Sequence, residues 1–157
     1  MAKNKNRKKV IMPQRVSEHR IPSTASDPDN YLKMPIRWSF SKIDYDHDQW
    51  GFVVQTQSLK TAFQYLGGLE QIGNWEKILH DGGGRGRGNT RHHEINCEKL
   101  CRDAQKRITE LNYLTDTMFS ISCGSVFRIW GIRSGDKFEV VWIDPKHEVY
   151  PIATNNK

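Results

Sequence analysis

Residues that could act on a phosphodiester gather near the end of the chain. Arg128 stands in an otherwise apolar stretch, and Arg133 lies farther along it. Lys146, His147 and Tyr150 follow the next apolar stretch. Arginine offers a forked donor that matches phosphate, histidine exchanges a proton near neutral pH, and tyrosine supplies a hydroxyl or a stacking ring. RNA cleavage without a metal needs such groups: a base for the ribose 2′-hydroxyl, an acid for the leaving oxygen and cations for the phosphorane.

The elements around these residues are β-strands. Alternating or continuous apolar patterns with turn residues between them predict three strands, at residues 118–123, 126–133 and 137–143. In an antiparallel meander, the end of the last strand lies beside the start of the one before it. We therefore expect Lys146, His147 and Tyr150 to lie near Arg128. An alternative stays open, in which the arginine only faces solvent or pairs with a carboxylate and the histidine is an ordinary surface residue.

Two further groups of residues have metal-ligand types. Asp44, Asp46 and Asp48 resemble the start of a calcium loop, but its sixth and twelfth positions hold glutamines, where a glycine and a bidentate glutamate are needed. We do not expect calcium there. His93, Cys97 and Cys101 stand four apart, which would place them on one face of a helix, but a closed site needs a further ligand from elsewhere. The apolar spacing of the two cysteines favours buried thiols, so no metal or other cofactor is expected.

A glycine-rich segment at residues 82–88 contains Arg85 and Arg87 and is followed by Arg91. No Gly-Lys-Ser/Thr follows it, so it is not a nucleotide-binding P-loop. Its composition is typical of a flexible connector. The alternative is a loop whose three arginines contact RNA.

The net charge of +6 comes from the first part of the chain. Residues 1–20 hold seven basic side chains and one acidic one, so the remaining 137 residues are neutral. With the proline-containing polar stretch that follows, this predicts a basic, disordered tail over residues 1–30 and a single domain over residues 31–157. No apolar run is long enough to cross a membrane, and an odd number of cysteines, three, favours reduced thiols. We expect a cytoplasmic protein.

The rest of the domain is predicted to be mixed. A first strand is expected at residues 36–43, short helices at 59–66 and 75–80, and a longer helix at 96–111. In that longer helix, four residues should face the sheet: Leu100, Ala104, Ile108 and Leu111. The fold class is α+β in the order β-α-α-β-β-β, an antiparallel meander with the helices packed on one face.

This order, and the pattern of residues 118–150, resemble the RelE/ParE superfamily of small bacterial toxins. In that pattern Arg128 occupies the position of the arginine on the central strand, His147 the basic position and Tyr150 the final aromatic position. The chain is longer than usual for that family and its body is neutral, so residues 44–57 and the glycine-rich segment count as insertions. The ending at residues 142–151 is also similar to that of uncharacterised bacterial proteins.

The resemblance implies a RelE-like toxin of a toxin–antitoxin pair. Such a toxin is a metal-independent endoribonuclease that cuts mRNA, in some members on the ribosome, and a cognate antitoxin protein keeps it silent. Other members are ParE-like inhibitors of a topoisomerase, and the resemblance does not choose between them. A third possibility is a non-catalytic module that holds nucleic acid or a protein through its basic tail and the Arg85/Arg87 segment.

Overall fold

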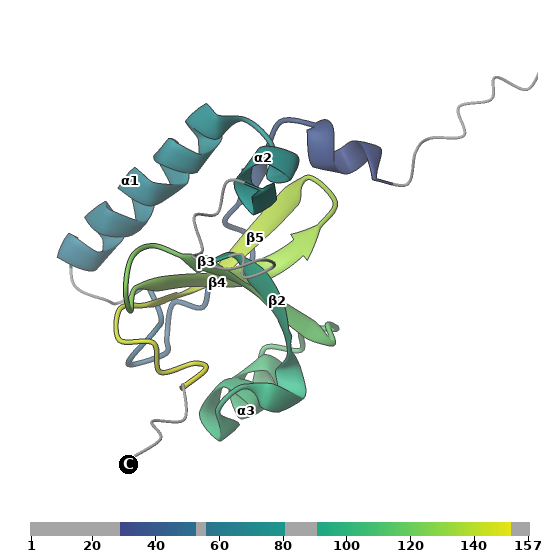
Figure 1. Cartoon of the computed structure of the whole chain (residues 1–157). Helices are drawn as coiled ribbons and strands as arrows, with labels where there is room; N and C mark the ends of the chain where they lie inside the picture. The colour runs from purple at the N-terminus through teal and green to yellow at the C-terminus, as the bar shows by residue number, and fades with distance from the viewer. Residues whose placement is uncertain (1–28, 53–55, 81–90, 152–157) are drawn as a thin grey trace, which may run out of the picture.

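The computed structural model describes residues 29–52, 56–80 and 91–151, and its elements are drawn in Figure 1. The predicted tail, residues 1–30, lies outside these ranges except for its last two residues. A mixed sheet of five strands carries helices on both of its faces. The α+β class is confirmed, and the predicted strands and helices follow one another in the predicted order.

The sheet has the strand order β1-β5-β4-β3-β2. Its strands are β1 (Arg37–Ser39), β2 (His93–Asn96), β3 (Thr117–Ser122), β4 (Arg128–Ser134) and β5 (Lys137–Asp144). β3, β4 and β5 form the predicted antiparallel meander, and β1 adds to β5 in parallel. Gly135 turns the chain between β4 and β5 with φ 62°, a left-handed conformation that glycine adopts without strain.

The first strand is shorter than predicted. It ends at Ser39, and the next residues turn so that the chain comes back along β5 without forming a regular strand. In this return the backbone N–H of Asp44 donates to Val141, and that of Ile143 donates to Trp50. The segment 44–52 therefore extends the sheet edge beyond β1, at the end where β5 finishes.

The helix after this segment is longer than predicted. α1 (Thr56–Ile72) runs through Gly67 and Gly68, where the sequence predicted its end, and Gly73 ends it with φ 103°. Each interior glycine costs about 1 kcal/mol of helix stability, but burial of Leu69, directly after Gly68, offsets this cost. α2 (Trp75–His80) has the predicted bounds.

The longer helix predicted at residues 96–111 is wrong in its first half. Residues 93–96 form the additional strand β2, which pairs with β3, and the 3-10 turn η2 (Cys97–Lys99) follows it. The α-helix proper, α3 (Arg102–Glu110), begins after Cys101, whose sulfur accepts the backbone N–H of Ala104. Tertiary pairing with β3 determines the start of this region, and spacing along the chain cannot show that.

The sequence predicted that all helices pack on one face of the sheet, but the structure places them on both faces. α1 and α2 cover one face together with the 3-10 turn η1 (Asn30–Lys33), and α3 covers the other (Figure 1). Almost every residue of β3 and β5 is buried, so the side chains on both faces of the sheet must be covered by other elements. Leu100, Ala104 and Ile108 pack on the sheet as predicted, while Leu111 is only half-buried. No described helix has the length and apolar character that a membrane span needs.

Candidate functional site

Four strand ends meet at one end of the sheet. Arg128 at the start of β4 pairs with Asp144 at the end of β5 and with Ser122 at the end of β3, and His93 starts β2 beside Ser120. Of the three residues after β5 that were expected near Arg128, His147 is found there. Five cationic or titratable residues gather here and form what we call the basic edge: Arg91, His92, His93, Arg128 and His147.

Asp144 shapes the loop that carries His147. This carboxylate is fully buried and accepts four hydrogen bonds. Its acceptor contacts are Oδ1 with the backbone N–H groups of Lys146 (3.3 Å) and Glu148 (3.0 Å), and Oδ2 with Val149 N–H (3.0 Å) and Trp130 Nε1–H (3.3 Å). His147 itself has φ 63°, an uncommon left-handed conformation for a residue with a side chain. The carboxylate thus holds a strained loop in one shape and with it the imidazole.

The guanidinium of Arg128 is held by backbone carbonyls of the β3–β4 loop. Nη1 donates to Gly124 (3.2 Å) and Phe127 (2.9 Å), and Nη2 donates to Ser125 (3.2 Å). An arginine has five N–H donors, so one on Nε and one on Nη2 have no acceptor among the residues that the structure describes. Those two form the side fork that matches two oxygens of a phosphate. The loop therefore fixes the guanidinium in one orientation and leaves one edge of it suited to an anion.

Burial and neighbouring positive charges both lower the pKa values of His147 and His92. Burial lowers the pKa of His147, and the charge of Arg128 lowers it further, against the opposing effect of Asp144. Burial, followed by the charges of His93, Arg128 and Arg91, lowers the pKa of His92 to about 4. Both imidazoles are therefore neutral at pH 7. A neutral imidazole can accept a proton, as a general base must.

His92 was not singled out from the sequence. Its Nδ1 accepts the backbone N–H of Ser122 at 3.1 Å, so the ring proton of the neutral histidine sits on Nε2. The contact joins residues 30 positions apart, at the ends of β2 and β3. Its only sequence signal was the pair of adjacent histidines, which the metal hypothesis used in part.

The other predicted site residues lie in different surroundings. Lys146 is exposed next to His147, whereas Tyr150 packs half-buried against the α3 face. Arg133 lies at the far end of β4 from Arg128, where its guanidinium faces the rings of Tyr31, Trp75 and Phe119 at 5.2–5.8 Å, and its Nη2 pairs with Glu94 at 3.4 Å. Arg85 and Arg87 are outside the described residues. The catalytic role of Tyr150 stays a prediction.

The residues of the hypothetical metal site are separated by the true element boundaries. His93 belongs to β2, Cys97 opens η2 and Cys101 caps α3, so they do not share one helix face as the spacing suggested. Within the described ranges, no three metal-binding side chains are grouped to hold an ion. Cys123 is buried beside the basic edge, and burial raises the pKa of its thiol to about 12.

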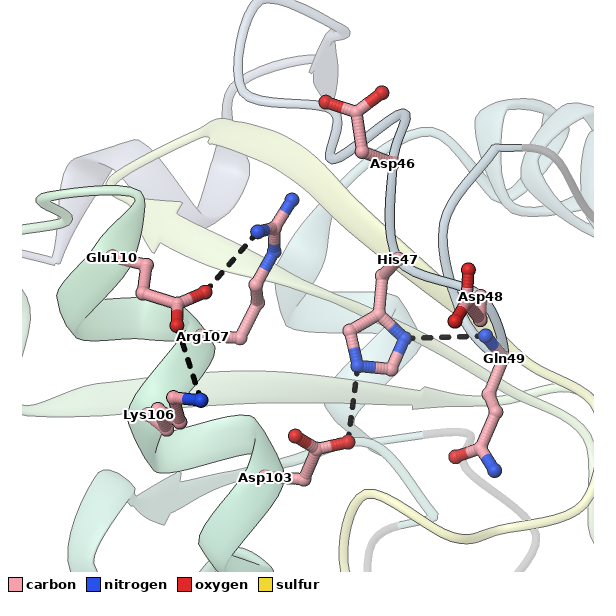
Figure 2. A pocket seen from close by; sticks show the side chains of 8 residues that line it. All are labelled: Asp46, His47, Asp48, Gln49, Asp103, Lys106, Arg107 and Glu110. Carbon is pink, nitrogen blue, oxygen red and sulfur yellow. Dashed lines mark hydrogen bonds and ion pairs between the residues drawn. The ribbon is translucent and has the colours of Figure 1, made fainter.

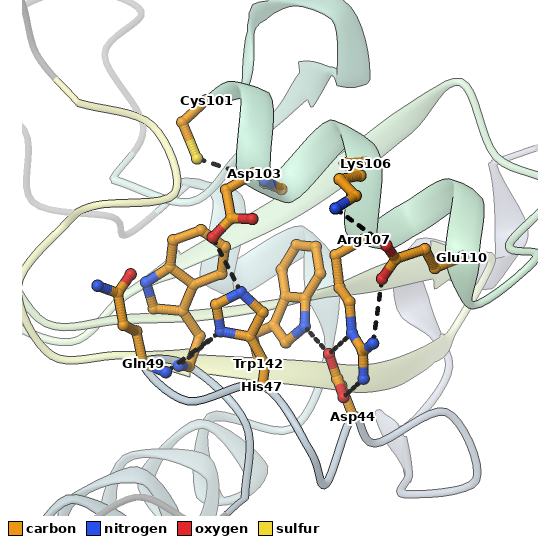
Figure 3. A network of polar contacts seen from close by, with 11 residues as sticks. Asp44, His47, Gln49, Cys101, Asp103, Lys106, Arg107, Glu110 and Trp142 are labelled. Atoms are coloured by element: carbon orange, nitrogen blue, oxygen red, sulfur yellow. Dashed lines mark hydrogen bonds and ion pairs between the residues drawn. The ribbon is translucent and has the colours of Figure 1, made fainter.

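A second polar site lies between the segment 44–52 and α3, as a pocket of about 320 Å³ (Figure 2). Arg107, which lines the pocket, is held by the buried carboxylate of Asp44, which accepts Arg107 Nε–H (2.8 Å), Arg107 Nη2–H (2.7 Å) and Trp142 Nε1–H (2.9 Å) (Figure 3). Burial alone raises the pKa of Asp44, but these bonds and the Asp46 N–H outweigh burial and lower it to about 2. The ion pair of Asp44 and Arg107 thus anchors α3 to the segment 44–52.

His47 lines the same pocket and faces Asp103 at 3.2 Å (Figure 2). Its ring stacks on Trp50 with centroids 4.2 Å apart, and its Nδ1 accepts the backbone N–H groups of Gln49 and Trp50, both at 3.3 Å. Nδ1 is thus occupied and Nε2 carries the proton toward Asp103. A histidine with both ring nitrogens hydrogen-bonded in this way holds the loop, so we assign this pocket a structural role.

Comparison of the chain with models of protein families, with curated proteins and with solved structures finds no match. The basic edge therefore has to be interpreted from its own geometry.

Proposed function

We propose that the basic edge binds a phosphodiester of RNA and cleaves it without a metal, as a RelE-like toxin does. The observation that carries the proposal is the convergence of Arg128 and His147. Arg128 lies at the start of β4 and His147 follows the end of β5, and these two strand ends are paired. Hydrogen bonds hold the loop beside each residue in place. A fixed cation beside a neutral imidazole is an arrangement suited to a reaction in which a proton leaves and negative charge develops.

In the proposed reaction, His147 takes the proton of the ribose 2′-hydroxyl while the oxygen attacks the neighbouring phosphorus. The remaining fork of Arg128 stabilises the charge on the non-bridging oxygens. The bond to the 5′-oxygen breaks, and that oxygen takes a proton from an acid. His93, which lies close enough to lower the pKa of His147, is the acid that we propose. The products are a 2′,3′-cyclic phosphate and a 5′-hydroxyl.

The test is cleavage of a single-stranded RNA by the full chain and by His147→Ala, with EDTA present throughout. Loss of an acid–base group should lower the rate about 10²–10⁴-fold, and loss of the Arg128 fork in Arg128→Lys about 10²–10³-fold. His80→Ala is the matched control, because His80 is an exposed histidine on α2, away from the basic edge. Circular dichroism should show that each variant is folded.

Cleavage by folded His147→Ala at the wild-type rate would contradict the mechanism. A wild-type chain that binds RNA and does not cut it would favour the alternative, a binding module. One observation favours the binding module: three of the five N–H donors of Arg128 donate to backbone carbonyls of the protein itself.

The toxin hypothesis also predicts that expression of the chain stops bacterial growth, that co-expression of a cognate antitoxin restores it, and that His147→Ala removes the effect. Growth arrest that persists in His147→Ala would instead point to a ParE-like action on a topoisomerase.

A further inference from the structure

Tyr65 brings an aromatic ring from α1 to the basic edge. A methyl group built on Gly124 would lie 3.6 Å from the Tyr65 hydroxyl oxygen. The carbonyl of that same Gly124 accepts Arg128 Nη1–H at 3.2 Å. The ring of Tyr65 and the guanidinium of Arg128 therefore meet at one loop, although their residues are 63 positions apart and belong to different elements.

The ring of Tyr65 is not needed for the core. α1 packs on the sheet through Ala62, Leu66 and Leu69, which are all buried, whereas Tyr65 is 41 % exposed on the flank of the helix. No hydrogen bond of its hydroxyl is found within the described ranges. An exposed ring with a free hydroxyl next to a phosphate-binding cation has the two parts with which proteins hold an unpaired nucleotide.

We infer that Tyr65 forms a base-binding subsite of the basic edge and stacks on an unpaired nucleobase of single-stranded RNA. The inference rests on the proposed function, because the phosphate held by Arg128 fixes where the neighbouring base lies. It narrows the substrate class to single strands, since the bases of a duplex are paired and stacked on one another. Tyr65 binds substrate in this scheme and takes no part in proton transfer.

The experiment measures binding of a fluorescent 2′-O-methyl RNA, which lacks the nucleophile for cleavage, to the full chain. Stacking of one base contributes enough that Tyr65→Ala should weaken binding roughly 5- to 150-fold. Tyr65→Phe keeps the ring and should bind like the wild type. Phe63→Ala is the matched control, because Phe63 is a 49 % exposed ring on the same helix that contacts Phe40 and Phe52 instead of the basic edge.

Wild-type affinity of folded Tyr65→Ala would overturn the inference, and so would equal losses in Tyr65→Ala and Phe63→Ala. A Tyr65→Phe variant as weak as Tyr65→Ala would overturn the stacking, and equal binding of the RNA and its duplex would overturn the substrate class. The proposed cleavage is judged separately on unmodified RNA. If the chain does not cut it but Tyr65→Ala still weakens binding, the cleavage proposal fails and the subsite remains.

Discussion

Replacement of Asp144 by asparagine tests whether this carboxylate organises the His147 loop. The two oxygens of Asp144 accept four hydrogen bonds, two each. An asparagine keeps one oxygen and turns an NH2 group toward the donors of the other, so two donors lose their acceptor whichever way the amide turns. The amide will turn so that the pair of donors whose loss costs less free energy is left without an acceptor.

The cheaper side is the one that faces Lys146 and Glu148. Those two N–H groups are only partly buried, so water can replace the lost acceptor, whereas Trp130 Nε1 and Val149 N are buried. Each buried donor without a partner costs about 1–3 kcal/mol. Two fully buried donors would cost about 2–6 kcal/mol, but water reaches the N–H groups of Lys146 and Glu148, so we expect Asp144→Asn to lower the free energy of unfolding by about 1–3 kcal/mol. Asp144→Ala loses all four acceptor contacts and should cost more.

Urea unfolding of the full chain measures the loss, and amide hydrogen exchange locates it. Exchange should quicken at Lys146 and Glu148 in Asp144→Asn, and RNA cleavage should fall with it because the loop that carries His147 is released. Asp116→Asn is the control: its side chain is exposed, and the substitution keeps the backbone carbonyl that accepts Cys97 N–H. Equal stabilities of Asp144→Asn and the wild type, within about 0.5 kcal/mol, would refute the reasoning.

Three further predictions concern stability and charge. The pKa of Asp44 is about 2 in the folded chain and 3.8 ordinarily, so its ionisation contributes about 2 kcal/mol to stability at neutral pH. This contribution is lost as the pH falls from about 4 to 2. Asp44→Asn should therefore show a flatter acid-unfolding curve than Asp48→Asn. Leu100→Ala should lower the free energy of unfolding by about 2–5 kcal/mol in urea, and a neutral result would contradict the assigned buried face. Inorganic phosphate should raise the pKa of His147 and of His92 in an NMR titration, because an anion offsets the cations that lower both, and an unchanged titration would argue against anion binding.

The C-terminal meander could be predicted because its signals are local. Alternation of apolar residues, with turn residues between the stretches, predicts β3, β4 and β5 within one or two residues of their bounds. The meander then dictates that the residues after β5 come back to the start of β4, so the neighbourhood of Arg128 and His147 followed from topology alone. No knowledge of side-chain contacts was needed for either step.

The parts that could not be predicted depend on contacts between distant segments. α1 continues through two glycines because Leu69 beyond them is buried on the sheet, and the predicted helix starts late because the strand β2 pairs with β3 just before it. Arg133 looked like a phosphate ligand by residue type, but three rings from separate elements surround it. His92 and Tyr65 reach the basic edge through partners far away in the sequence, Ser122 and Gly124. Residue types alone carry no information on such pairs.

The charge distribution at the basic edge argues for an anionic ligand. Cations that lower one another's pKa raise the free energy of the folded chain unless a negative charge compensates them. Among the described residues, Asp144 is the only carboxylate that acts on both Arg128 and His147, and its oxygens are already occupied by backbone N–H groups and by Trp130. The fold thus places the Arg128 guanidinium and imidazoles at the end of the sheet and uses the buried carboxylate of Asp144 to shape the loop. A phosphate group would supply the missing charge, which is why RNA is the ligand that we propose first.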